Sequence, residues 1–233
     1  MAEQTSATST ASRALAYCVF QEQNGIALPT TGVGGAQVRE IALGGLRALW
    51  SEVEWPFAPA GLQRHAVEFH QVVHQVFARA AVAPFPLLTI FDDRSTLESF
   101  FTTCAPTITA DLERLHNMVQ MECVLYVIGT KAHAGPEPEL LQSLEHSLAQ
   151  TQQAFGLISP DVRVRAVKSG RRIFALVRRG REEEFRAIAE SLPLPERISR
   201  RTAGPRPAAE FLSQPLRAPN STEGRANNLG SQP

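Results

Sequence analysis

The sequence is short of the features that mark exported, membrane-spanning and disulfide-stabilised proteins. Its 233 residues include only three cysteines. These are Cys18, Cys104 and Cys123, which are widely spaced and form no C-x-x-C pair, so neither a disulfide framework nor a cysteine-based zinc site is expected. The N-terminal residues have no apolar signal core, and no run approaches the roughly 18 uninterrupted apolar residues that a membrane span needs. We expect a soluble, cytoplasmic protein.

The chain also lacks a net charge, because 23 Lys and Arg residues balance 23 Asp and Glu residues. No long-range field therefore favours nucleic acid or an anionic membrane as a partner. The balance conceals a local asymmetry, since residues 161–206 contain 13 basic and six acidic residues. The C-terminal half is basic, and the rest of the chain compensates for it.

Recognisable catalytic and cofactor motifs are missing as well. There is no Gly-x-Ser-x-Gly sequence, and the glycines of residues 32–35 precede no Lys-Ser/Thr pair of a phosphate loop. His70 and His74 have a spacing that suits a metal, but no cysteine or acidic cluster completes a site. Asp92 and Asp93 are interpreted as loop and helix-start residues. We expect no enzymatic activity, no cofactor and no metal.

Hydrophobic periodicity predicts an N-terminal α+β module over residues 14–119, after a disordered leader at 1–13. Strands are expected at 14–20, 38–43 and 46–53, and Gly44-Gly45 predicts a two-residue hairpin. An amphipathic helix is expected over 60–80. Pro84 and Pro86 lack backbone donors, so they exclude a central strand at the start of the next segment but not over 87–91, and an edge entry into a strand is expected. Ser95 and Glu98 have capping-box spacing for a further helix, which Pro106 should break or restart.

A second module is predicted over residues 120–212. Strands are expected at 121–128, at 162–167 and at 173–177, with Ser169-Gly170 as the turn between the last two. One helix should begin at the prolines 136 and 138 and end at Gly156, and another should follow the acidic run 182–184. A last strand leads to a Gly-Pro-Arg-Pro segment. The order β-α-β-β-α-β is the ferredoxin-like arrangement, and residues 213–233 have the composition of a disordered tail.

In this order the segments resemble the gas vesicle protein L/F (GvpL/GvpF) family, accessory proteins of gas vesicle formation. The resemblance spans most of residues 14–212 and is carried by GGLRALWSEV, the histidine-bearing helix, VAPFPLLTIF with DDRSTLESF, MECVLYV and GPRPAAEF. It implies two α/β modules, the first ferredoxin-like or related to that fold, and a C-terminal tail. The positions that match the family pattern are Pro84, Thr89, Glu122, Gly204, Pro205, Pro207 and Phe211.

Two segments depart from that pattern. Pro86-Leu87-Leu88 stands where the family usually has Arg-Phe-Gly after the proline, and Arg206 and Ala208 stand in a motif that often reads Gly-Pro-Trp-Pro-Pro. Contacts made by that arginine or tryptophan are therefore absent. The resemblance implies a non-enzymatic role in gas vesicle assembly, in the cytoplasm and at the vesicle, with the hydrophobic shell protein and other accessory proteins as partners.

The basic strand pair is the candidate binding surface. Arg163, Arg165, Arg171 and Arg172 have two interpretations beyond a solvated strand face. They could meet acidic patches on a protein partner, which steers association. The alternative is a ferredoxin-like regulatory module that binds RNA or a small molecule through this hairpin, although Phe174 is its only aromatic ring and RNA recognition favours a stacking platform. The edge strand of either module also makes partner binding by strand addition feasible.

Overall fold

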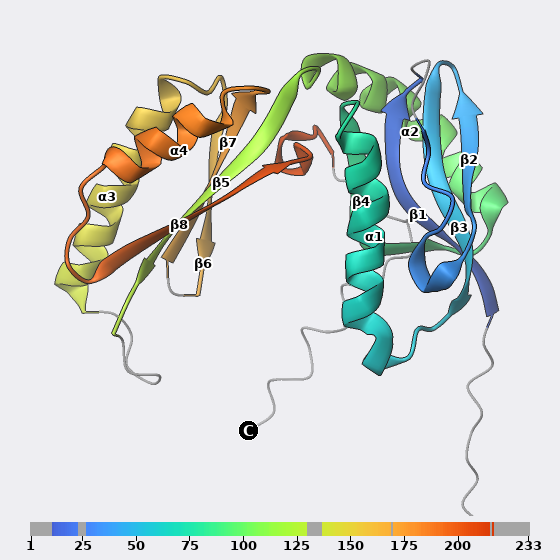
Figure 1. Ribbon diagram of the computed structural model, residues 1–233, viewed down its shortest axis with the longest axis horizontal. Helices are drawn as coiled ribbons and strands as arrows, with labels where there is room; N and C mark the ends of the chain where they lie inside the picture. The colour runs from blue at the N-terminus through green and yellow to red at the C-terminus, as the bar shows by residue number, and fades with distance from the viewer. Residues whose placement is uncertain (1–10, 23–26, 130–136, 169, 215, 217–233) are drawn as a thin grey trace, which may run out of the picture. The chain divides into compact units, whose positions relative to one another are not determined.

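The computed structural model describes residues 11–22, 27–129, 137–168, 170–214 and 216 (Figure 1). Contacts divide the chain into a first unit, which contains residues up to Arg114 together with those from Ser213, and a second unit, Leu115–Leu212. Each unit holds a four-stranded sheet whose strand pairs are all antiparallel. The predicted α+β class, with two modules in series, is confirmed.

The first sheet has the strand order β2-β3-β1-β4. Its strands are β1 (Ala11–Gln21), β2 (Val38–Leu43), β3 (Leu46–Trp55) and β4 (Val82–Phe91). The predicted Gly-Gly hairpin joins β2 to β3, and both glycines have positive φ, 56° at Gly44 and 82° at Gly45. Two consecutive positive φ values match the twist of a two-residue hairpin and strongly favour glycine.

Helices cover both faces of the first sheet. They are α1 (Leu62–Phe77) and α2 (Arg94–Arg114), and Figure 1 shows them on opposite sides of β1. Every residue of β1 from Ala14 to Phe20 is buried, although successive side chains of a strand point to opposite faces. A short 3-10 helix, η1 (Val33–Gly35), contacts α1, and a second one, η2 (Pro59–Gly61), precedes it. Both faces of this sheet are therefore core.

Strand β4 begins at Val82, five positions before the expected regular strand. It lies at the edge of the sheet along its whole length, where only an edge entry was expected, and it pairs with β1 over residues 82–84 and again from Thr89. Residues 85–88 leave the ladder, where Leu88 has a φ of 58° and Leu87 is exposed. The hydroxyl of Thr89 donates to the carbonyl of Pro86 at 2.8 Å. The two prolines thus shorten the ladder without preventing the strand.

The start of α2 differs from the predicted capping box. The carboxylate of Asp93 accepts the backbone amide of Thr96 at 2.7 Å and its hydroxyl at 2.9 Å. Asp93, not Ser95, is therefore the residue that caps the helix, two positions earlier than expected. The hydrogen bond from the backbone amide of Thr96 is also the main reason that the pKa of Asp93 lies below its usual range. Glu98 binds Arg94 instead of closing a box.

Helix α2 runs without a break through Pro106, which corrects the expectation of a break or restart. An internal proline costs a helix about 3 kcal/mol because it removes one hydrogen bond and crowds the preceding turn. Leu97 and Phe101 before the proline, and Ile108 and Leu112 after it, are all at most 2% exposed. Burying such side chains contributes about 1.5–3 kcal/mol each, so the continuous apolar stripe outweighs the local cost.

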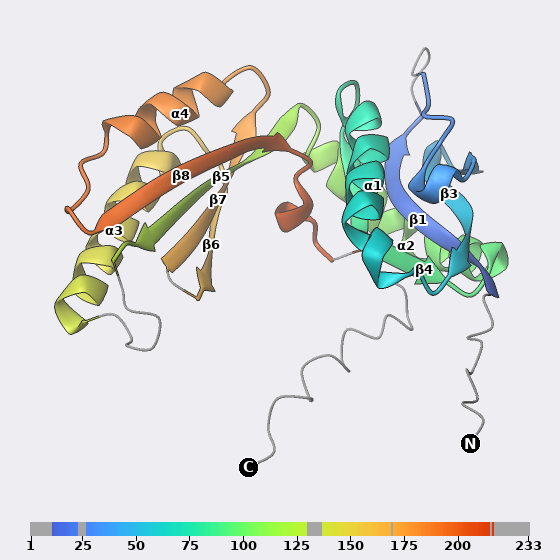
Figure 2. The ribbon, with the colours of Figure 1, turned by 60° about the horizontal axis from the view of Figure 1, so that its bottom comes forward.

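The second sheet has the order β6-β7-β5-β8 and confirms the predicted β-α-β-β-α-β arrangement. Its elements are β5 (Met118–Val127), α3 (Pro138–Gly156), β6 (Val162–Val167), β7 (Gly170–Arg178), α4 (Glu182–Ser191), β8 (Ile198–Arg206) and the 3-10 helix η3 (Ala209–Phe211). Figure 2 shows α3 and α4 on the same side of this sheet. Phe155 of α3 and Phe185 of α4 stack at a centroid distance of 4.3 Å.

The turn between β6 and β7 is one residue earlier than expected. Gly170 pairs with Val167 and is the first residue of β7, so it is not a turn residue. A Cβ at Gly170 would lie 1.9 Å from the carbonyl oxygen of Leu125 on β5, which only glycine avoids. Residue 169 lies outside the described residues.

Ordered structure extends into both segments that were expected to be disordered, residues 1–13 and 213–233. Ala11, Ser12 and Arg13 belong to β1. Ser213 donates its amide and its hydroxyl to the buried carboxylate of Asp111, both at 2.7 Å, and Leu216 is buried. The remainder of both segments, and most of the loop before α3, lie outside the described residues.

Candidate functional site

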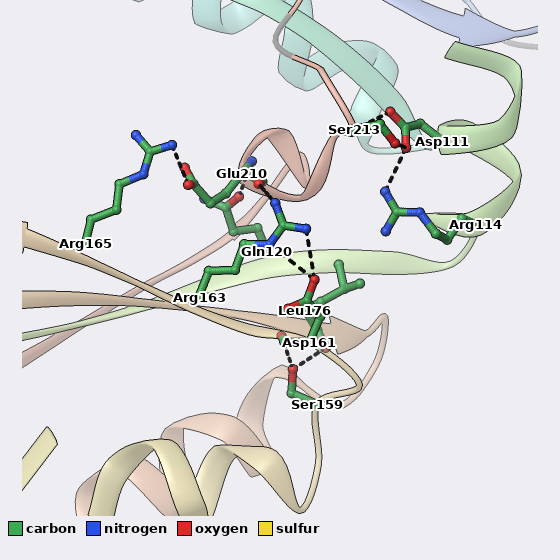
Figure 3. A network of polar contacts seen from close by, with 10 residues as sticks. All are labelled: Asp111, Arg114, Gln120, Ser159, Asp161, Arg163, Arg165, Leu176, Glu210 and Ser213. Carbon is green, nitrogen blue, oxygen red and sulfur yellow. Dashed lines mark hydrogen bonds and ion pairs between the residues drawn. The ribbon is translucent and has the colours of Figure 1, made fainter. Parts of the chain in front are cut away.

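The segment Gly204–Phe211, here called the closing segment, folds over the face of the second sheet that carries no helix (Figure 3). The backbone amide of Glu210 donates to the side-chain carbonyl of Gln120 on β5 at 3.0 Å. Arg163 on β6 donates to the backbone carbonyl of Glu210 at 2.5 Å, and its guanidinium lies 5.0 Å from the centre of the Phe211 ring. The closing segment is thus held by both a central and an edge strand.

Beneath the closing segment lies Glu122, whose side chain is only 8% exposed. Its carboxylate accepts the side-chain amide of Gln120 at 3.1 Å and the guanidinium of Arg206 at 3.3 Å. A carboxylate buried this far needs a cation or donors to offset lost hydration. Arg206, which departs from the family pattern, provides that cation in this chain.

Gly204 is required by the geometry at the start of the closing segment. Its φ is 118°, a conformation that side chains rarely allow, and a Cβ there would lie 2.9 Å from the carbonyl oxygen of Gln120. The ladder between β5 and β8 shifts register at this point. Pro205 is the last residue but one of the edge strand β8, which ends at Arg206, and Pro207 follows the strand. Neither proline offers an amide to a further strand.

Three of the four predicted arginines lie on this helix-free face. Arg163 binds Asp161 at 3.0 Å, and Arg165 binds Glu210 at 2.5 Å. Arg172 pairs with Arg165 across β6 and β7, and its Nε is buried without a hydrogen-bond acceptor among the described residues. Arg171 is the exception, because it binds Glu145 on α3 and so lies on the helix side.

Strand pairing adds a fourth arginine, which sequence reasoning did not single out. Arg165 pairs with Arg172, Arg172 with Val124 and Val124 with Arg201, so one cross-strand row runs over all four strands. We call Arg165, Arg172 and Arg201 the arginine row. Tyr126 lies two residues along β5 on the same face and is half-buried. Alternation of side chains along β8 puts Arg200 and Arg201 on opposite faces of the sheet. Only the register between β5 and β8 places Arg201 in this row.

Pro84 and Thr89, the remaining family-pattern positions, lie in the first unit on β4. The first unit does have a shallow pocket beside the start of α2, and several charged residues line it. Its arginines are neutralised: Arg13 binds Asp92 at 2.6 Å, and Arg39 binds Glu52 at 3.3 Å. Arg94 of the same pocket binds Glu98.

The glycines of residues 32–35 are held by protein contacts, and His70 and His74 each lie against a phenylalanine ring of their own helix. The amide of Val33 donates to the Tyr17 hydroxyl at 2.9 Å, and that of Gly34 donates to Glu68 at 2.8 Å. His70 and His74 are exposed on α1. Over the described ranges, no three His, Cys, Asp or Glu side chains lie close enough together to hold a metal. No helix in the same ranges is long and apolar enough to cross a membrane.

The fold defines an α+β protein with two four-stranded sheets in series, the second of them ferredoxin-like. Residues 14–192 match the sequence profile of the gas vesicle synthesis protein GvpL/GvpF family, and the chain belongs to that family. This is a family of gas vesicle accessory proteins that is not known for catalysis, and membership supports an accessory role in gas vesicles. The match ends before β8, so the closing segment lies beyond it.

Two solved structures share the fold. The gas vesicle protein GvpF from Anabaena sp. PCC7120 aligns with a TM-score of 0.70 at 15% identity, over 88% of this chain and 97% of that one. GvpF from Microcystis aeruginosa aligns with a TM-score of 0.68 at 12% identity, over 87% and 99%. No curated protein matches the sequence.

Proposed function

We propose that this protein is a non-enzymatic assembly factor that binds the hydrophobic shell protein of gas vesicles, together with other accessory proteins, in the cytoplasm and at the vesicle. Membership of the GvpL/GvpF family carries this proposal. Binding would shield apolar surface of shell subunits before they polymerise. The described structure contributes surfaces on which such a partner can be held.

The four edge strands of the two sheets differ in their suitability for strand addition. β4 contains Pro84 and Pro86, and β8 contains Pro205 next to its last residue, so each of these edges has positions without a backbone donor and is partly protected. β2 and β6 contain no proline and both carry ion-paired residues, but those of β2, Arg39 and Glu40, have opposite charges, whereas those of β6 are both arginines. β6 alternates valine with arginine and has pairing partners only on β7. We therefore assign shell-protein binding to the edge of β6.

The test is co-expression of the shell protein with and without this chain, followed by measurement of the soluble fraction of the shell protein. The full chain should raise that fraction, and no difference would count against the proposed function. A lysine on an edge strand blocks pairing with another chain. Ala166→Lys on β6 should therefore weaken the effect, whereas Ala42→Lys, at an equally exposed alanine of β2, should leave it intact. The reverse result would move the binding edge to the first unit.

A regulatory RNA-binding role is the second candidate. It is favoured by the arginine row and Tyr126 on the sheet face that ferredoxin-like RNA-binding domains use. Against it stands Phe174, the aromatic residue of β7 on that face, which is only 5% exposed and lies beneath Arg165. Without an exposed ring on β7, Tyr126 is the one aromatic ring of this pair that is left for a base to stack on.

A further inference from the structure

We infer that the arginine row is the docking surface for an extended acidic segment of a partner protein, with acidic residues at every second position. The inference rests on the proposed function, because it takes the partner to be a gas vesicle protein. It adds what that function does not supply, namely the face of the molecule and the chemistry of the segment that binds there.

The charge on the row is not neutralised within the chain. Arg165 binds Glu210, but neither Arg172 nor Arg201 has a carboxylate partner among the residues that the structure describes. Arg201 is exposed and Arg172 is half-buried, with its Nε lacking an acceptor. The pocket of the first unit is the contrast, since each of its arginines already binds an acid. Carboxylates of a partner would supply what the row lacks.

The closing segment shows what kind of chain this face accepts. Its Glu210 places a carboxylate on Arg165 and a backbone carbonyl on Arg163, and the next residue, Phe211, sets its ring against the Arg163 guanidinium. Figure 3 shows the Glu210 carboxylate directed to one arginine and its carbonyl to the other. A segment with an acidic side chain is therefore already bound at one end of the row, and Arg172 and Arg201 continue the same surface beyond it.

The dimensions of the row fit an alternating segment. Neighbouring strands lie about 4.8 Å apart, so three strand spacings from Arg165 to Arg201 span about 14 Å. In an extended chain, residues two apart lie on one side at about 6.7 Å, so three alternate carboxylates span about 13 Å. The residues between them point away from the sheet and are free to vary. Half-buried Val124 lies between Arg172 and Arg201 and gives the segment an apolar contact.

The test measures binding of labelled probes to the full chain by fluorescence anisotropy at low salt. The probe is a decapeptide of alternating Glu and Thr, compared with one of alternating Gln and Thr and with an oligothymidylate. The variant Arg172→Gln/Arg201→Gln removes both unpartnered charges of the row. The matched control, Arg64→Gln/Arg79→Gln, removes the same number of charges from exposed positions of the first unit. Circular dichroism spectra confirm that both variants are folded.

We expect the Glu peptide to bind, the Gln peptide to bind at least about tenfold more weakly, and Arg172→Gln/Arg201→Gln to lose about tenfold in affinity for the Glu peptide. The control variant should bind like the original chain. Added salt should weaken binding, since exposed charge pairs are screened. Equal binding of the two peptides, or no effect of the row variant, overturns the inference. Tighter binding of the oligothymidylate through the same arginines also overturns it and assigns the face to nucleic acid.

The shell-protein assay separates failure of this inference from failure of the proposed function. If the original chain raises the soluble fraction of the shell protein and Arg172→Gln/Arg201→Gln does so less, both stand. If the variant is as effective as the original chain, the function stands and the docking face is wrong. If the original chain has no effect, the proposed function fails, whatever the peptides do.

Discussion

Replacing Gly204 with alanine is expected to destabilise the second unit strongly. The backbone at this position has a φ of 118°, and holding a residue with a side chain in such a conformation costs about 1–3 kcal/mol. The new Cβ would also lie 2.9 Å from the carbonyl oxygen of Gln120 and 2.8 Å from the sulfur of Met121. The Met121 sulfur can move, but the Gln120 carbonyl belongs to the central strand β5.

Relieving that contact requires β8 to move away from β5, and comparable overpacking costs about 1–3 kcal/mol. The two effects together give about 2–6 kcal/mol. For a domain of about 100 residues this corresponds to a fall of about 10 °C or more in the unfolding midpoint. Far-UV circular dichroism measures it. Tryptophan fluorescence shows which unit is destabilised, because Trp50 and Trp55 both lie in the first unit, whereas Gly204 lies against β5 of the second unit.

Gly156→Ala is the matched control. Gly156 is the last residue of α3, and nothing lies within 4 Å of the position that its Cβ would take. Alanine there should raise stability by about 0.4–1 kcal/mol, because it restricts the unfolded chain and favours the helix. A Gly204→Ala protein whose circular dichroism midpoint stays within about 2 °C of the original would refute the argument. A shift confined to the tryptophan signal would refute it too.

Two further predictions concern the cap of α2 and the thiols. Asp93→Ala should lower the tryptophan-detected midpoint, and Asp93→Asn, which retains a capping oxygen, should lower it less. Because the folded-state pKa of Asp93 is depressed, the difference between the original chain and Asp93→Ala should fade as pH falls through that pKa; a constant difference would contradict the cap. Burial raises the pKa of Cys18 to about 12 and that of Cys123 to about 11. At pH 8, about one pH unit below an ordinary thiol pKa, an aromatic disulfide reagent should therefore react rapidly with only one thiol of the folded protein, that of half-buried Cys104. After denaturation all three thiols should react. Rapid reaction of three thiols in the folded protein would contradict the burial of Cys18 and Cys123.

Sequence reasoning was most successful where a signal is local. The Gly44-Gly45 turn is set by the φ values that two adjacent residues must adopt, and it forms where predicted. The capping residue of α2 was missed because Asp93 and Ser95 are both good caps. Leu97 and Phe101 are buried against the sheet whether the helix is capped by Asp93 or by Ser95, so the apolar pattern does not distinguish the two possible caps.

The candidate binding face was predicted only in part, because it depends on register between strands far apart in sequence. Alternation along a strand separates Arg171 from Arg172, but the sequence did not show which side carries helices. The row itself requires Arg165 and Arg201 to align through β7 and β5. The register shift between β5 and β8 lies outside this row, between Gln120 and Glu122, where Gly204 approaches the backbone of β5. The pairing of Glu122 with Arg206 depends on the same shift.

The two units differ in what covers their sheets, and this difference is why we place the proposed partner surface on the second. In each sheet, the second strand along the chain pairs with the third, the third with the first and the first with the fourth. In the second unit two crossover helices share one face, which leaves the other to a short closing segment. In the first unit the described residues between β1 and β2 contain no α-helix, and the additional helix α2, after β4, covers the opposite face. The first sheet is thus buried on both sides, and its pocket arginines are paired with acids. The same strand order in the second unit leaves a sheet face with arginines that its own chain only partly neutralises.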